Sequence, residues 1–285
     1  MKKKLLLILL LLPIIGKSQA PFQSRPTALT INQKTFEFSL FSQSRYGFAK
    51  NTEVYSSVLE DWLLPNIGIK RLWYTKPAKK ETGFFASRNI YFGSLHTFDY
   101  PKMFFDFPTI QKRGDISDTC ITPSVITMKN EIRATIFLKN KTSCSEGDFL
   151  LTLRAGLKNS FKLNKNANMP PITKPLWYRE SVVCLDTIVW FVGADLDIHI
   201  TDRINLLVDA DFYSVDWNVK DWSGENKIFA YGYLYERRIL VQAGVKFLYG
   251  TINKDFDSNL LPMIDFSYFF KPKKRQTGLW GNMKI

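Results

Sequence analysis

The sequence predicts an all-β protein: a transmembrane, antiparallel up-and-down barrel. Residues 239–250 alternate strictly between an apolar side, from Ile239 to Tyr249, and a side that carries Gln242, Gly244 and Lys246. Such a strand suits the wall of a barrel with lipid on one face and a polar interior on the other. Aromatic residues make up 15% of the chain, as in barrels whose aromatic side chains gather at the two membrane interfaces. After the amino terminus, no apolar run reaches the roughly 18 residues of a spanning helix.

The amino terminus predicts export. Lys2, Lys3 and Lys4 precede an apolar run over residues 5–15, and small residues follow it. This pattern is typical of a secretory signal peptide. We place the signal at residues 1–18, because cleavage after Ala20 would put Pro21 at the scissile bond. Export together with amphipathic strands predicts the outer membrane of a Gram-negative bacterium, with outer-membrane lipid as a partner.

The charge balance is basic. The full chain has a formal net charge of +13 and a mean hydropathy of −0.13. A basic surface could meet lipid phosphates, an anionic solute or an acidic partner, and charge alone does not choose among them. Nucleic acid is not an expected partner of an exported barrel.

About ten strands are predicted, each an alternating stretch bounded by polar residues. They are residues 35–46, 66–75, 83–97, 121–139, 149–158, 187–200, 204–215, 228–235, 239–250 and 260–270. The clearest hairpin turns at residues 201–203. Residues 121–139 are predicted as one strand, because only Asn130 interrupts their apolar face. Splitting this segment at 129–131 and adding a strand in 176–185 gives twelve strands, the alternative count.

The connections supply a check on this topology. With both termini in the periplasm, short inner turns should alternate with longer outer loops. The predicted inner turns, of nine residues or fewer, are 76–82, 140–148, 201–203 and 236–238. The predicted outer loops, of nine or more, are 47–65, 98–120, 159–186, 216–227 and 251–259.

The last strand carries alternating aromatic residues at Phe266, Tyr268 and Phe270. It resembles the carboxy-terminal signature of Gram-negative outer-membrane barrels, although no glycine precedes the aromatics and 15 residues follow Phe270. The resemblance covers the architecture of the whole chain and names no particular family. It implies one barrel over residues 19–270 and a basic periplasmic tail over 271–285.

Charged residues of the predicted strands should meet inside the barrel. We expect the aspartates at 195, 197, 209 and 211 to pair with cations across a narrow lumen. The predicted network consists of Arg133, Arg154, Asp195, Asp197, Asp209, Asp211 and Lys246. Ten strands imply a largely blocked interior, because eight are filled by side chains and sixteen or more leave a channel.

Two histidines limit the catalytic options. Asp197 and His199 resemble the acid and histidine of the omptin outer-membrane proteases, but the topology puts them at the inner end rather than at the outer rim. His96 lies near Ser94 and Asp99, where a lipid hydrolase could use a serine and a histidine. The histidines and cysteines show no ligand spacing, so neither a metal nor a cofactor is expected.

The outer loops and the tail are candidate partner-binding segments, because exposed aromatic residues tend to mark interaction sites. The candidates are Phe104, Phe105, Trp177, Trp217, Trp222 and Trp280. In the ten-strand topology Cys120 and Cys184 share the outer side and could form a disulfide, whereas in the twelve-strand topology Cys120 would share it with Cys144.

The sequence therefore predicts a non-enzymatic outer-membrane barrel that binds a partner, as a subunit of an envelope transport or secretion assembly. A small narrow channel or transporter is the first alternative, and a rim hydrolase acting on peptides or lipids is the second. At the level of the fold, the alternative is a soluble exported sandwich.

Overall fold

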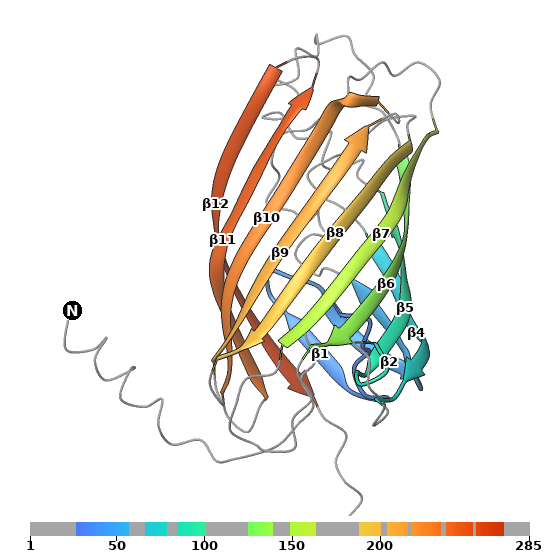
Figure 1. Ribbon diagram of the computed structural model, residues 1–285, viewed down its shortest axis with the longest axis vertical. Helices are drawn as coiled ribbons and strands as arrows, with labels where there is room; N and C mark the ends of the chain where they lie inside the picture. The colour runs from blue at the N-terminus through green and yellow to red at the C-terminus, as the bar shows by residue number, and fades with distance from the viewer. Residues whose placement is uncertain are drawn as a thin grey trace, which may run out of the picture.

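The computed structural model describes residues 27–56, 66–78, 85–100, 125–138, 149–163, 188–200, 204–215, 218–234, 238–252 and 255–270. They form a closed barrel in which each strand pairs antiparallel with its neighbours in sequence and β1 closes the ring against β12 (Figure 1). The strands are β1 (Phe36–Ser39), β2 (Ser44–Ala49), β3 (Thr52–Ser56), β4 (Asn66–Lys76), β5 (Ile90–Asp99), β6 (Val125–Phe137), β7 (Phe149–Lys162), β8 (Ile188–His199), β9 (Ile204–Val215), β10 (Asn218–Leu234), β11 (Ile239–Ile252) and β12 (Asp255–Phe270). None of the described residues forms a helix long and apolar enough to cross a membrane.

The barrel has twelve strands, the second of the two predicted counts, but the extra strands lie at its amino-terminal end. The predicted strand 35–46 is divided between β1 and β2, and β3 lies within the predicted loop 47–65. β6 is a single strand, as predicted. Because β1, β2 and β3 have only four to six residues each, they show too little alternation to be separated from the sequence.

Three predicted connections are also corrected. β10 begins at Asn218 and β12 at Asp255, so most of the predicted outer loops 216–227 and 251–259 is strand. The segment between β4 and β5 covers residues 77–89 rather than 76–82. The early parts of β10 and β12 are rich in polar residues, and this polarity made them look like loops. The closed ring also excludes the soluble two-sheet sandwich.

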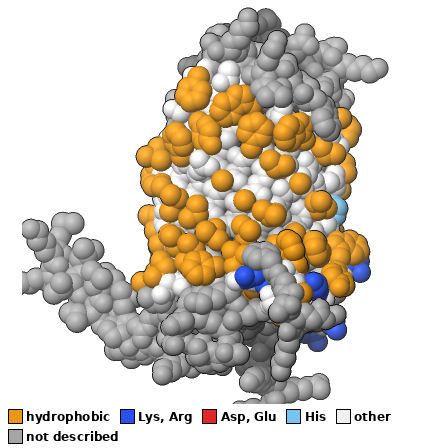
Figure 2. Space-filling model, in the orientation of Figure 1, with side chains coloured by type: hydrophobic (Ala, Val, Ile, Leu, Met, Phe, Trp, Pro, Cys, Tyr) orange, Lys and Arg blue, Asp and Glu red, His pale blue; other side chains and the backbone are white. Residues whose placement is uncertain are grey.

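The two faces of the wall have opposite polarity. On β11, Lys246 is 0% exposed, whereas its neighbours Val245 and Phe247 are 41% and 39% exposed. Charged side chains of β6 to β10 are likewise buried inside, and large apolar side chains cover the outside. Figure 2 shows hydrophobic side chains spread over the visible wall, with Lys and Arg at its lower edge.

Aromatic side chains form two groups on the outer wall. The upper band, near the end where β9 and β11 finish, contains Trp190, Phe212, Trp222 and Tyr249, whose successive ring centroids are 5.7–5.9 Å apart. The lower band, at the end where β12 finishes, contains Phe36 and Phe270 on β1 and β12, and Tyr74 and Phe92 on β4 and β5. Two separated bands are typical of barrels that cross a membrane.

The segment before β1 lies inside the lower part of the barrel. In this N-terminal segment, residues 27–35, Ala28 N donates to Thr135 Oγ1 over 2.8 Å and Ile31 N donates to Glu53 Oε2 over 2.7 Å. Gly47 on β2 permits its close approach, because a Cβ there would lie 2.1 Å from the Asn32 carbonyl oxygen. A glycine in a strand interior often marks such a close backbone contact.

Candidate functional site

Ion pairs connect inward-facing side chains of β1–β4 and β6–β11 in groups, and we call these groups together the lumen belt. Its acids are Glu37, Glu53, Glu131, Asp195, Asp209, Asp211 and Glu225, and its bases are Arg45, Lys70, Lys129, Arg133, Arg154, Lys227 and Lys246. Among the described residues, seven acids thus face seven bases, all buried. The belt is therefore formally neutral, which matches the rule that buried charges need partners.

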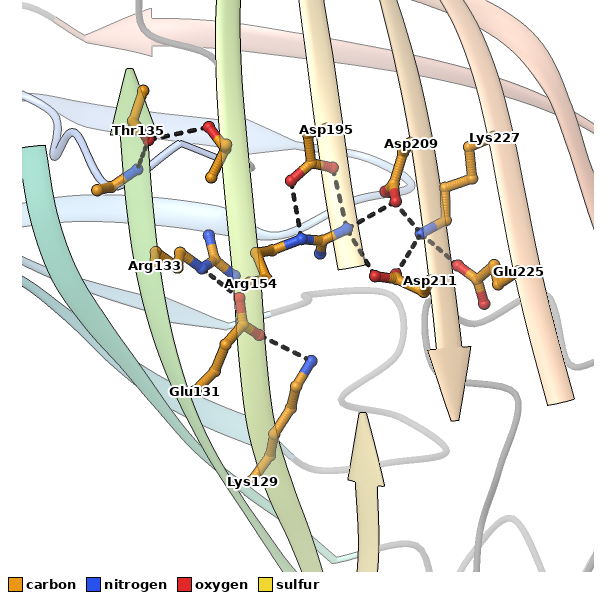
Figure 3. Close-up of polar contacts among 12 residues, drawn as sticks. Lys129, Glu131, Arg133, Thr135, Arg154, Asp195, Asp209, Asp211, Glu225 and Lys227 are labelled. Atoms are coloured by element: carbon orange, nitrogen blue, oxygen red, sulfur yellow. Dashed lines mark hydrogen bonds and ion pairs between the residues drawn. The ribbon is translucent and has the colours of Figure 1, made fainter. Parts of the chain in front are cut away.

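Arg154 on β7 is the centre of the best-connected part of the belt (Figure 3). Its Nε lies 2.8 Å from Asp195 Oδ2, and its Nη2 lies 2.6 Å from Asp209 Oδ1 and 2.8 Å from Asp211 Oδ1. Lys227 approaches the same aspartates from β10, with Nζ 3.1 Å from Asp209 Oδ2. One guanidinium and one ammonium therefore neutralise most of the charge of three neighbouring carboxylates.

The belt continues on both sides of this centre. Lys227 also pairs with Glu225, whose other oxygen lies 2.9 Å from Lys246 Nζ. On β6, Glu131 lies between Arg133 and Lys129, at 2.5 Å and 3.1 Å. Each acid thus has a base on its own strand or on a neighbouring one, as cross-strand pairing favours.

The amino-terminal strands carry the remaining pairs. Arg45 Nη2 lies 2.5 Å from Glu37 Oε2, and Lys70 Nζ lies 3.2 Å from Glu53 Oε1. Glu53 also accepts the hydrogen bond from Ile31 N. The belt and the N-terminal segment are consequently tied together.

Apolar clusters occupy other parts of the lumen. Leu207, Tyr231, Leu240 and Phe269 form one cluster towards the lower end. Val189, Phe191 and Tyr213 form another towards the upper ends of β8 and β9. Charged and apolar layers therefore succeed one another along the interior.

Six of the seven residues predicted for the charge network lie in the belt, and the predicted pairing of the aspartates with Arg154 is present for three of them. Arg154 contacts three of the four aspartates, but Arg133 pairs with Glu131, and Lys246 pairs with Glu225. Asp197 accepts hydrogen bonds from the Tyr231 hydroxyl at 2.9 Å and 2.8 Å.

Eight belt members were not predicted, although each lies in the inward phase of its own strand. They are Glu37, Arg45, Glu53, Lys70, Lys129, Glu131, Glu225 and Lys227. Alternation alone could have placed Lys129, Glu131 and Lys70 inside. It could not have chosen their partners, because pairing depends on the register between strands.

The remaining predicted site residues are the Asp197 and His199 pair, the aromatic partner-binding candidates and the disulfide candidates. His199 Nδ1 lies 2.6 Å from Asn205 Oδ1, so His199 and Asp197 each have a partner near the lower end of the barrel. Trp222 lies on β10 in the upper band, not in a loop. The remaining partner-binding and disulfide candidates lie outside the described residues: Phe104, Phe105, Trp177, Trp217, Trp280, Cys120 and Cys184.

The fold and the belt define a β-barrel protein with side chains packed across its interior. Within the described part of the chain, no group of three or more His, Cys, Asp or Glu residues could hold a metal ion. A neutral belt favours neither anions nor cations, so its clearest role is to hold the wall together. No protein-family model matches this chain, and no curated protein does.

Proposed function

We propose that the protein is an outer-membrane barrel of a Gram-negative bacterium, closed inside, that acts through its outer wall and its two ends. The observation that carries this proposal is the reversed polarity of the wall, with Lys246 fully buried between exposed Val245 and Phe247. A water-soluble barrel would gain nothing from this arrangement, whereas a lipid-facing barrel requires it. The two aromatic bands and the signal-like residues 1–18 support the same location.

The closed interior argues against the competing function of a narrow channel. Twelve strands fall between the eight of a barrel filled by side chains and the sixteen of an open pore. The lumen belt, the two apolar clusters and the N-terminal segment all occupy this space. We therefore expect no steady passage of solutes.

Two measurements test the proposal. After expression with its signal, the protein should stay in the membrane fraction through an alkaline wash and should need detergent for extraction. Release by the wash alone would contradict the membrane location. In planar lipid bilayers the purified protein should show no defined single-channel openings, and ohmic openings of constant size would identify a channel instead.

We also propose that the loops or tail bind a protein partner, in an envelope transport or secretion assembly. The support is the aromatic residues that the loops and the tail carry in the sequence. Trp222 is not counted among them, because it lies in the upper aromatic band, where the proposed membrane interface accounts for it. Affinity purification in mild detergent should recover the same partner from wild type and from Trp222→Phe, and lose it with Phe104→Ala/Phe105→Ala or Trp280→Ala. Recovery that none of these variants changes would contradict a partner site at the predicted residues.

A further inference from the structure

A second group of polar side chains lies on the outer wall, away from the lumen belt. Ser94 and His96 of β5 and Asn130 of β6 all occupy the outward phase of their strands, and His96 is paired in register with Asn130. His96 Nδ1 lies 2.8 Å from Asn130 Oδ1, and His96 Nε2 lies 3.0 Å from Ser94 Oγ. From β4, Trp73 Nε1 donates to Ser94 Oγ over 2.7 Å.

These contacts place His96 between Ser94, which has a hydroxyl proton to give, and Asn130, which orients the imidazole ring. With Asn130 Oδ1 as the acceptor, the tautomer of His96 that makes this hydrogen bond carries its proton on Nδ1. In that tautomer Nε2 accepts the hydroxyl proton of Ser94. A serine hydrogen-bonded to a histidine that a third residue orients is the arrangement that activates a serine nucleophile.

Apolar side chains flank this cluster on β5 and β6. Ile132 is paired with Ser94 in register and is 68% exposed, and Phe92 and Phe98, on the same face of β5, are also exposed. Polar groups that face lipid cost free energy, so they usually mark function. A purely structural role would be served better by apolar residues of the kind that make up most of the wall.

A cation lies beside the serine. Arg71 on β4 is paired in register with Ser94, is exposed, and places its guanidinium 4.3 Å from the centre of the Trp73 ring. Arginine is well suited to binding phosphate. Ser94 is two residues, or roughly 7 Å along the strand, from Phe92 in the lower band. With the lower band at the membrane interface, as the proposed location requires, Ser94 lies near the boundary between headgroups and acyl chains, where the ester bonds of a phospholipid are found.

We propose that Ser94, His96 and Asn130 form the catalytic site of an acyl-ester hydrolase on the outer wall, and that its substrates are glycerophospholipids whose phosphate binds Arg71. Ser94 is the nucleophile, His96 the general base and acid, and Asn130 the positioning residue. The lipid specificity rests on the proposed membrane location. An enzymatic activity departs from the non-enzymatic role that the sequence analysis favoured and corresponds to its second alternative, a hydrolase acting on lipids.

The reaction is a two-step acyl transfer to water. Ser94 Oγ attacks the ester carbonyl carbon while its proton passes to His96 Nε2. The bond to the glycerol oxygen then breaks, and His96 returns the proton to that oxygen, which releases a lysophospholipid. Water attacks the acyl-serine, with its proton passing through His96, and fatty acid leaves as Ser94 regains its hydrogen.

Trp73 lies beside the nucleophile. Ser94 is 6% exposed, whereas Trp73, whose Nε1 donates to Ser94 Oγ, is 59% exposed. Its Nε1 proton, which Ser94 Oγ now accepts, lies near the position where negative charge develops on the carbonyl oxygen. Donors at that position stabilise the transition state.

The test uses full-length protein folded into vesicles of phosphatidylglycerol and phosphatidylethanolamine, and measures fatty acid release. Wild type should release fatty acid, Ser94→Ala should fall to background, and His96→Ala should lose about 10²–10⁴-fold. Asn130→Leu should lose activity, and Asn130→Asp, which keeps an acceptor for Nδ1–H, should retain it with an altered pH profile. The matched control is His199→Ala, which removes the inward-facing histidine of the His199–Asn205 pair and should leave the rate unchanged.

Two further measurements separate the possible failures. A fluorophosphonate should label folded wild type: Ser94 Oγ bonds to the phosphorus, its proton passes to His96, and fluoride leaves as the P–F bond breaks. It should not label Ser94→Ala. Heat-dependent gel mobility reports whether each variant is folded. Cleavage of soluble p-nitrophenyl butyrate without cleavage of vesicle lipid would support the catalytic site and overturn the lipid substrate. Folded wild type that is neither labelled nor active on either ester overturns the hydrolase proposal and leaves the closed-barrel proposal standing.

Discussion

Replacement of Arg154 by methionine should strongly destabilise the barrel. The side chain length is similar, but three buried carboxylates lose their shared cation. Lys227 remains 3.1 Å from Asp209 and 3.9 Å from Asp211, so these two keep a partner. Among the described contacts, the ion pair of Asp195 is with Arg154. The variant therefore leaves at least one buried charge uncompensated, which typically costs ~3–5 kcal/mol of unfolding free energy.

The measurement is urea unfolding in lipid vesicles, followed by tryptophan fluorescence. The double variant Arg154→Met/Asp195→Asn removes the isolated carboxylate, so it should be less destabilised than the sum of the single variants by ~1–3 kcal/mol. Lys50→Met, at the exposed turn between β2 and β3, is the control for charge removal and should stay within about 0.5 kcal/mol of wild type. A loss of under about 1 kcal/mol for Arg154→Met, or strict additivity in the double variant, would refute the stabilising role of the belt.

Three further predictions follow from the wall and the N-terminal segment. Val245→Arg, on the outward face of β11, should cost ~2–4 kcal/mol in vesicles, and an unchanged folded fraction would argue against a lipid-facing wall. Gly47→Ala should cost ~1–3 kcal/mol in the same urea assay, because its Cβ would meet the Asn32 carbonyl oxygen at 2.1 Å; equal stability would mean that the N-terminal segment is not held there. Arg71→Gln should slow phospholipid cleavage about tenfold, equivalent to a loss of 1.4 kcal/mol, and leave p-nitrophenyl butyrate cleavage unchanged; an equal loss on both esters would exclude a phosphate-binding role.

The sequence predicted the parts of the fold that depend on alternation. Strands such as β8 and β11 have long, regular apolar stripes, and the burial of Lys246 between exposed neighbours follows the same alternation. The sequence did not separate β1, β2 and β3, since strands of four to six residues have no measurable period. It also treated polarity as a sign of loops, although the early part of β10 is a polar strand.

The lumen belt shows a different limit. Alternation assigns Arg154, Asp195 and Asp209 to the interior, and their contacts were predicted. Glu131 and Glu225 lie in the same inward phase, but their pairing with Arg133 and Lys246 depends on side-chain reach and on which strands are neighbours. A single sequence gives the face of each residue and leaves the cross-strand register open.

The cluster of Ser94, His96 and Asn130 on the outer wall shows the same limit: the sequence predicts the face of each residue, and only the register shows that they are neighbours. In the sequence, Asn130 was only the one interruption of an apolar stripe, and Ser94 and His96 were a serine and a histidine, near Asp99, that a lipid hydrolase could use. The β5–β6 register places His96 opposite Asn130, and the β4–β5 register places Arg71 opposite Ser94. Polar residues on the outer faces of β4, β5 and β6 thus lie together at one place on the wall. Hydrogen bonds connect Trp73 to Ser94, Ser94 to His96, and His96 to Asn130. In the proposed membrane location, lipid would penalise each of these polar residues separately, so a function that needs all of them together is the better explanation.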